Sequence, residues 1–178
     1  MIARDTLLSR MRRLLADEDA RTYSDYELVR AVDDGLEWLS RHLALQGSDL
    51  TTESVMLQSG DALPDDFITL CSVFDADGRQ LICLRAGLPI TCGTYRIEGG
   101  ILRTEGRAAV TYQKRLPALG ENSSLDLPTT LTDTVAKVGV LMLAGADASS
   151  CAKALAEDDL LFARRHRSRR TAAMPWRI

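Results

Sequence analysis

Histidine is scarce in this chain, and the motifs that build common active sites are missing. Only two histidines occur: His42 falls within an expected helix, and His166 lies among arginines whose charge makes it a poor base. The sequence holds no G-x-S-x-G nucleophile motif, no Walker loop and no G-x-G-x-x-G dinucleotide motif. These absences argue against triad and nucleotide-binding enzymes, and we predict a protein without a catalytic role.

The four cysteines show neither C-x-x-C spacing nor neighbouring histidines, so we expect no metal and no other cofactor. They are Cys71, Cys83, Cys92 and Cys151. We predict buried, inert thiols, because a free cysteine behaves as a small hydrophobic residue. Cys71 and Cys83 can also approach each other across a hairpin that turns at Asp77-Gly78, so a disulfide there stays an alternative.

Long hydrophobic runs are missing as well. The longest nearly apolar run, residues 138–146, has nine residues, whereas a membrane-spanning helix needs about 20. The N-terminus, M-I-A-R-D-T-L-L-S-R, lacks the apolar core and the cleavage site of a signal peptide. We therefore expect no membrane anchor and no membrane partner.

Acidic residues occur in three adjacent pairs: Asp33-Asp34, Asp65-Asp66 and Asp158-Asp159. Paired carboxylates can act as general acid and base, but sequence neighbours on a helix point in different directions. Acids near a helix start are also favoured by the helix dipole. We interpret the three pairs as solvated surface rather than as catalytic sites.

Charge is distributed very unevenly along the chain. Residues 163–178 hold six arginines and no acid, whereas the other residues carry 16 basic and 25 acidic groups. The split indicates an acidic body with a basic arm that binds another molecule. Arginine and tryptophan often supply most of the binding energy of an interface. The candidate partner-binding residues are therefore Arg164, Arg165, Arg167, Arg169, Arg170, Trp176 and Arg177.

Hydrophobic periodicity predicts helices at both ends of the chain. They are expected over residues 4–16, 25–45, 131–145 and 150–167. Ser24 and Glu27 form a capping box at the start of the second helix, since each side chain can bond the other residue's amide. Gly47 is expected to end that helix.

The later helices are expected to begin at hydroxyl caps, Thr130 or Thr132 for the third and Ser149 or Ser150 for the fourth. Residues 168–178 show no periodicity, so we expect an extended arm there.

A β region is expected between the helices, over about residues 53–115. Its clearest element is a hairpin with Gly99-Gly100 at the tip, because two glycines supply the positive φ angles of a tight turn. Pairing outward from this turn sets Ile97 opposite Leu102 and Tyr95 opposite Thr104. One face of the hairpin is therefore apolar.

Two further segments belong to this β region. Val110 and Tyr112 alternate with polar residues, as in a half-buried strand. The D-x-D-G string at 75–78 resembles part of a calcium loop, but the remaining ligands of an EF-hand are missing, and we interpret it as a hairpin turn. Together the elements predict an α+β fold: a small helical bundle with an inserted antiparallel β-hairpin/sheet region. We expect a single domain over 1–167, followed by the extended C-terminal arm, 168–178.

Several pieces occur in an order that resembles one family. They are the capped helix Y-S-D-Y-E-L-V-R-A-V-D-D-G-L-E-W-L (23–39), L-P-D-D-F (63–67), the hairpin 95–104, V-T-Y-Q-K-R-L-P-A-L (110–119) and a closing helix pair with a charged tail. This order is similar to that of the head-to-tail adaptor proteins of tailed bacteriophages, the connector subunits beneath the portal ring. The final strand departs from the family pattern, whose members carry bulkier, more aromatic residues there.

The resemblance implies a structural protein of the virion that is assembled in the host cytoplasm. Members form a ring, usually of twelve copies, whose helical parts dock on the portal protein while the β insertion projects toward a tail or nozzle protein. The ring conducts double-stranded DNA without reading its sequence. C-terminal segments of members insert against the portal, so the resemblance makes residues 164–178, the arginine arm, the expected portal contact.

Two other classes of function stay open. A nucleic-acid-binding protein would use the arginine arm to grip phosphate, and its affinity would fall steeply with salt. A cell-wall hydrolase carried on the virion is supported only by the abundance of acids.

The excess of acids in the body of the chain also suits the connector function. An acidic body suits a DNA conduit, because repulsion between like charges keeps the genome from sticking while it moves.

Overall fold

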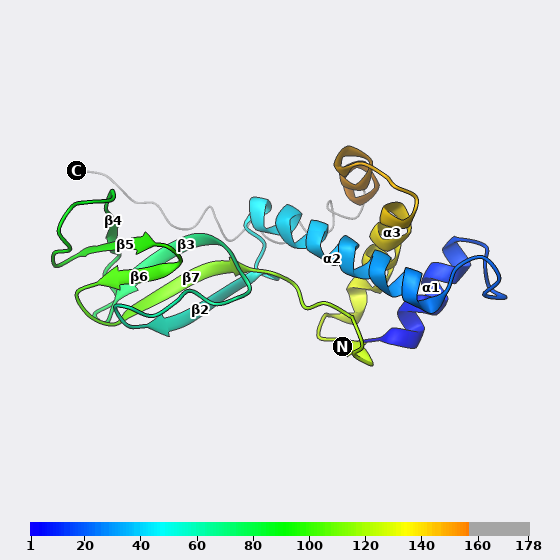
Figure 1. Ribbon diagram of the computed structural model, residues 1–178, viewed down its shortest axis with the longest axis horizontal. Helices are drawn as coiled ribbons and strands as arrows, with labels where there is room; N and C mark the ends of the chain where they lie inside the picture. Colours follow the sequence, from blue (N-terminus) through cyan, green and yellow to red (C-terminus); the bar gives the residue numbers. More distant parts are fainter. Residues whose placement is uncertain (157–178) are drawn as a thin grey trace. The chain divides into compact units, whose positions relative to one another are not determined.

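A computed structural model describes residues 1–156 of the chain, which have an α+β fold (Figure 1). These residues gather into two compact units. The helical unit consists of residues 1–38 and 117–156, and the β unit is the single inserted segment Leu39–Leu116. The end of the expected fourth helix and the expected arm, 168–178, lie outside the described residues. The single domain expected over 1–167 stays a prediction.

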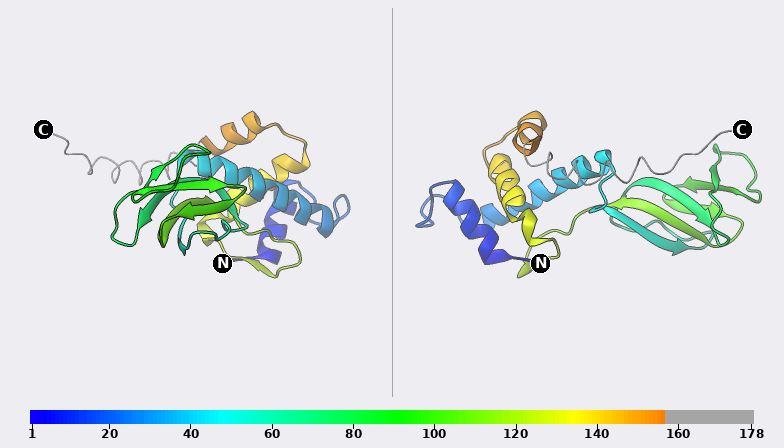
Figure 2. Two further views of the ribbon diagram at one scale, coloured as in Figure 1. Left: turned by 60° about the vertical axis from the view of Figure 1, so that its left-hand side comes forward. Right: turned by 180° about the vertical axis from the view of Figure 1, so that it is seen from behind.

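Three of the expected helices are confirmed to within a few residues (Figures 1 and 2). They are α1 (Arg4–Leu14), α2 (Asp25–Gln46) and α3 (Thr132–Leu143), and a 3-10 turn, η1 (Thr129–Leu131), precedes the last. A fourth helical stretch begins at residue 148 and is described as far as residue 156. The chain passes from the helical unit to the β unit within α2.

Reciprocal hydrogen bonds begin α2 as predicted. The Glu27 amide donates to Ser24 Oγ (3.3 Å), and the Ser24 amide donates to Glu27 Oε2 (2.8 Å), which confirms the capping box. The bonds from the Ser24 amide and hydroxyl lower the pKa of Glu27. Gly47 has a φ of 65° and its amide donates to the Ala44 carbonyl, so it ends α2 as expected.

The predicted caps of the later helices are wrong. Neither Thr130 nor Thr132 caps α3, which continues directly from η1, and Thr132 Oγ1 donates back to the Thr129 carbonyl (2.7 Å). The fourth stretch is capped by Asp147, whose Oδ1 accepts from the Ser150 amide (2.8 Å). A carboxylate adds the negative charge that the helix dipole favours, so it replaces the expected serine hydroxyl.

The helical unit is closed by a near contact between the backbones of α2 and α3. A Cβ added to Gly35 on α2 would lie 3.2 Å from the backbone nitrogen of Gly139 on α3. A Cβ on Gly139 would lie 3.0 Å from Cε of Met11 on α1. Both glycines are buried, so three helices meet at a point where two of them lack side chains.

A buried carboxylate organises the loop between α1 and α2. Asp17 accepts from the amides of Arg21 (3.0 Å), Thr22 (2.9 Å) and Tyr23 (3.1 Å), and Arg12 Nη1 lies 3.2 Å from Asp17 Oδ2. Burial acts to raise the pKa of Asp17, but the bonds from these amides outweigh it and the pKa is lowered.

A short strand pair in the helical unit was not predicted. β1 (Ile2–Ala3) pairs antiparallel with β8 (Ser124–Leu125). Ile2 and Leu125 are buried where the two strands meet. A two-residue strand is too short to show a periodic pattern in the sequence. Its position therefore depends on the partner strand, which is distant in the sequence.

The β unit contains two three-stranded sheets, which confirm the β region predicted over about 53–115. The strands are β2 (Thr52–Leu57), β3 (Phe67–Asp75), β4 (Ile82–Cys83), β5 (Thr94–Glu98), β6 (Ile101–Thr104) and β7 (Ala108–Lys114). One sheet has the order β2-β7-β3 and the other β4-β5-β6, in which β4 runs parallel to β5. The sheets are visible as separate layers of arrows in Figure 2.

Apolar side chains between the two sheets form the core of the β unit. The buried cluster comprises Leu57, Val73, Leu81, Tyr95, Leu102, Ala108 and Val110. The Leu81 amide donates to the Val73 carbonyl (2.8 Å), and the Leu102 amide donates to the Asp61 carbonyl (2.9 Å). These bonds attach the segments around Leu81 and Asp61 to the edges of β3 and β6.

The predicted hairpin has the expected register. Ile97 lies opposite Leu102 and Tyr95 opposite Thr104, and Gly99 and Gly100 have φ angles of 56° and 76°. Val110 and Tyr112 are buried on β7, as their alternation predicts.

The D-x-D-G string forms the predicted hairpin turn. Asp75 Oδ1 accepts from the amides of Asp77 (2.9 Å) and Arg79 (2.8 Å), so its carboxylate stabilises the turn.

Gly35→Val should destabilise the protein by about 1–3 kcal/mol, because the added methyl groups would force α2 away from α3. Asp34→Val is the matched control, since it introduces the same side chain at the exposed neighbouring position. Urea unfolding followed by circular dichroism measures both variants. A Gly35→Val variant as stable as the control would contradict the close crossing.

Asp17→Asn should lower the stability of the protein at neutral pH. It should also make stability depend less on pH in the acidic range. Folding lowers the pKa of Asp17, so its contribution is present above the ordinary value of 3.8 and is lost as pH falls through the lower folded value. Thermal melts between neutral pH and about pH 2 measure this difference, with Asp19→Asn as an exposed control. Parallel profiles for Asp17→Asn and the wild type would contradict the role of Asp17.

Candidate functional site

All seven residues predicted to bind a partner lie outside the described residues. They are Arg164, Arg165, Arg167, Arg169, Arg170, Trp176 and Arg177. The structure therefore does not place them, and the portal contact expected from the arginine arm stays a prediction.

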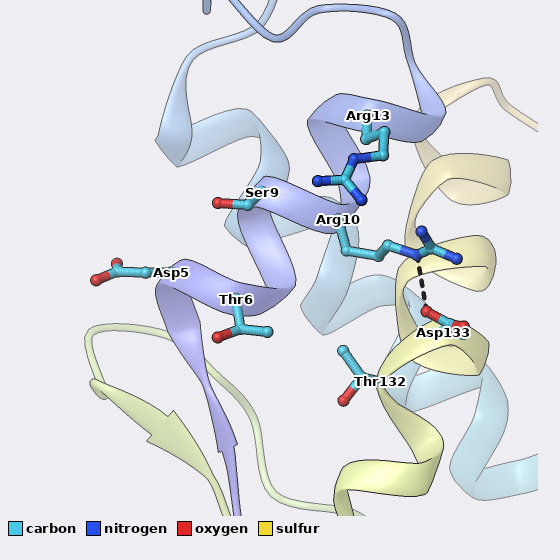
Figure 3. A pocket seen from close by; sticks show the side chains of 7 residues that line it. All are labelled: Asp5, Thr6, Ser9, Arg10, Arg13, Thr132 and Asp133. Atoms are coloured by element: carbon cyan, nitrogen blue, oxygen red, sulfur yellow. Dashed lines mark ion pairs between the residues drawn. The ribbon is translucent and has the colours of Figure 1, made fainter.

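An open, polar cleft of about 580 Å³ lies in the helical unit, between α1 and the start of α3 (Figure 3). It is lined by Asp5, Thr6, Ser9, Arg10, Arg13, Thr132 and Asp133. Sequence analysis named only Thr132 among these residues, as a candidate helix cap, and predicted no site here. The signal that could have found them is the spacing of Thr6, Ser9 and Arg13 along the polar face of α1.

An ion pair spans the cleft. Arg10 Nε lies 2.7 Å from Asp133 Oδ1. Arg13 points into the same region and has no ion pair within residues 1–156, while Asp5 points away from the other lining side chains (Figure 3). No histidine or cysteine lines the cleft, so this arrangement suits contact with a polar or acidic group and offers no activated nucleophile.

The first acidic pair is divided between a structural role and solvent. Asp33 Oδ1 accepts from the Leu119 amide (2.7 Å), and Asp33 Oδ2 accepts from the Gly120 amide (3.2 Å). The interpretation as solvated surface is therefore wrong for Asp33 and right for Asp34, which is exposed. Asp33 binds the chain where it re-enters the helical unit after the β insertion.

The second acidic pair is divided in the same way. Asp66 Oδ1 accepts from the Tyr112 hydroxyl (3.0 Å), whereas Asp65 is exposed. Burial, followed by the bond to Asp66, raises the pKa of Tyr112 to about 12. The interpretation as solvated surface is thus wrong for Asp66. The third pair, Asp158-Asp159, lies outside the described residues.

The prediction of buried thiols is wrong for three of the four cysteines. Cys71, Cys83 and Cys92 are exposed, Cys151 is buried, and all four are free, so no disulfide joins Cys71 to Cys83. Cys71 falls at a register shift between β3 and β7, where a bulge breaks the alternation of faces. Burial, followed by the nearby charge of Asp147, raises the pKa of the Cys151 thiol.

The described part of the chain offers neither a metal site nor a membrane-spanning helix. Residues 1–156 hold no cluster of three histidine, cysteine or acidic side chains arranged to bind a metal ion. Within the same residues, no helix combines the length and the apolar character needed to cross a membrane.

Comparison with known proteins identified no relative: no family model matches the chain, and no curated protein matches it.

Asp33→Ala should cost about 1–3 kcal/mol of stability, because it leaves the Leu119 and Gly120 amides without their acceptor. Asp34→Ala, the adjacent and exposed position, should change stability by less than about 0.5 kcal/mol. Chemical denaturation of both variants measures the difference. Equal effects of the two substitutions would show that the pair acts as solvated surface after all.

Proposed function

We propose that this chain is a structural subunit of a bacteriophage head–tail connector. In this role, copies form a ring beneath the portal, join the DNA-filled head to the tail, and line part of the DNA channel. The proposal rests on the order of sequence elements that resembles the adaptor family.

The observation that carries the proposal is the division of the chain into a helical unit and one inserted β unit. Residues 39–116 form a compact unit with its own core, and the helical unit is assembled from the segments before and after it. A connector must contact the portal on one side and the tail on the other. Two units with separate cores supply two surfaces that can be specialised independently.

The charges of the two units support the same role. The described part of the helical unit carries 8 basic and 13 acidic residues, whereas the β unit carries 8 basic and 9 acidic residues. Like-charge repulsion would keep DNA from adhering to an acidic ring. The arginine arm has the opposite charge and is proposed to bind the portal, where ring symmetry would multiply a weak contact.

A second candidate function is nucleic-acid binding through the arginine arm. Six arginines without an intervening acid in residues 163–178 suit phosphate as well as an acidic protein groove. The salt dependence of the binding affinity distinguishes the two candidate functions. Because phosphate binding releases counterions from DNA, its affinity falls steeply as ionic strength rises.

Truncation after Ala163 should weaken portal binding by more than about tenfold, or ~1.4 kcal/mol, while the melting temperature stays unchanged. Surface plasmon resonance against immobilised portal measures binding, and a matched run with duplex DNA serves as the comparison. Unchanged portal binding with a loss of salt-sensitive DNA binding would contradict the connector role and favour the second candidate.

A further inference from the structure

The two edges of the β2-β7-β3 sheet differ in how far they are protected. Two register shifts interrupt the pairing of β3 with β7, and an isolated antiparallel bridge joins Phe74 of β3 to Gln80 after the turn. The β2 edge pairs with β7 over residues 52–57 without a register shift, and it contains no proline, lysine or bulge. Proteins normally protect edge strands with such features, because a regular open edge can pair with another chain.

In the middle of the β2 edge, the outward backbone groups belong to Ser54 and Met56. The Lys114 amide donates to the Thr51 carbonyl, and bonded pairs alternate along an antiparallel ladder. Residues 53, 55 and 57 therefore bond to β7, while Ser54 and Met56 direct their amides and carbonyls away from it. The next outward amide, that of Gln58, is bound by the Asp61 side chain (2.7 Å). Within residues 1–156, no bond is seen to the outward groups of Ser54 or Met56.

The side chains around this edge form an uncharged outer face. Val55, Val110 and Val73 lie opposite one another and face the core. The neighbouring rows must face outward, and they consist of Ser54, Thr111 and Ser72 in one row and Met56, Ala109 and Phe74 in the other. Met56 is 57% exposed. This face is three strands wide and carries no charge, although 26% of the residues of the chain are charged.

The only charge on β2 is already neutralised. Glu53 Oε2 lies 2.5 Å from Lys114 Nζ on β7. Two copies of this edge can therefore approach without like-charge repulsion, in contrast to the helical unit with its excess of acids. The edge offers no charge that would select a charged partner.

We propose that β2 pairs antiparallel with β2 of a second copy of this chain. A two-fold axis at Val55 sets Ser54 of one copy opposite Met56 of the other, and the outward amides and carbonyls of these two residues then pair. In this register each Glu53 falls opposite Leu57, so the two acids do not face each other. The three-stranded sheets continue into one another across the dimer. This contact joins free copies and does not depend on the portal, so it goes beyond the proposed connector role.

Two substitutions test the pairing without disturbing the β7 ladder. Ser54→Pro removes an outward amide, which a fold tolerates at an edge strand. Met56→Lys adds a charge at the same edge and serves if the proline variant fails to fold. Ser72→Lys is the matched control, because it adds the same charge to the outer face on β3, away from the β2 edge.

Sedimentation equilibrium of the full chain, at concentrations up to about 1 mM, measures self-association. The wild type and Ser72→Lys should form dimers, and both β2 variants should associate at least about tenfold more weakly. A wild type that stays monomeric, β2 variants that dimerise normally, or a control that loses association equally would overturn the proposal. Portal binding of Met56→Lys should match the wild type, which separates failure of this contact from failure of the connector role.

Discussion

The near contact between the backbones of α2 and α3 at Gly35 and Gly139 is the constraint on which the helical unit depends. The two helices lie on opposite sides of a long insertion in the sequence, so forming their contact means closing a loop of about one hundred residues. Close packing over many atoms can offset that entropy. Asp33 adds bonds to the Leu119 and Gly120 amides only two residues before the glycine crossing on α2.

The inserted β unit has a hydrophobic core of its own. Its cluster from Leu57 to Val110 draws on both sheets, and the bonds at the edges of β3 and β6 belong to the unit itself. The helical unit, for its part, needs only that the inserted segment return the chain to Leu119. Such independence is useful in a protein proposed to contact different partners at its two units, because either surface can change without loss of the other core.

Local sequence signals were sufficient to predict those structural features that depend only on neighbouring residues. The Ser24–Glu27 capping box predicted the start of α2, and Gly99-Gly100 predicted both the turn and the register of the β5–β6 hairpin. Features that depend on distant partners were not predictable in this way. The β1–β8 pair needs residues from both ends of the chain, and Cys71 is exposed because a bulge breaks the alternation of β3.

The same limit applies to the candidate site. Asp33 and Asp66 were assigned to solvent because adjacent acids on a helix point in different directions and helix starts favour acids. Their hydrogen-bond partners, however, lie more than forty residues away in the sequence. The polar cleft likewise combines residues of α1 and α3. Charge asymmetry, by contrast, is a property of the sequence itself, and it is what singles out the arginine arm.

A connector subunit must assemble on a portal, and electron microscopy of the purified chain mixed with the portal of its own phage examines that requirement directly. The account predicts closed rings of this chain seated beneath the portal in the mixture, and no ring of this chain when the portal is absent. Free monomers or dimers beside an unoccupied portal, at concentrations well above those found in an infected cell, would contradict it.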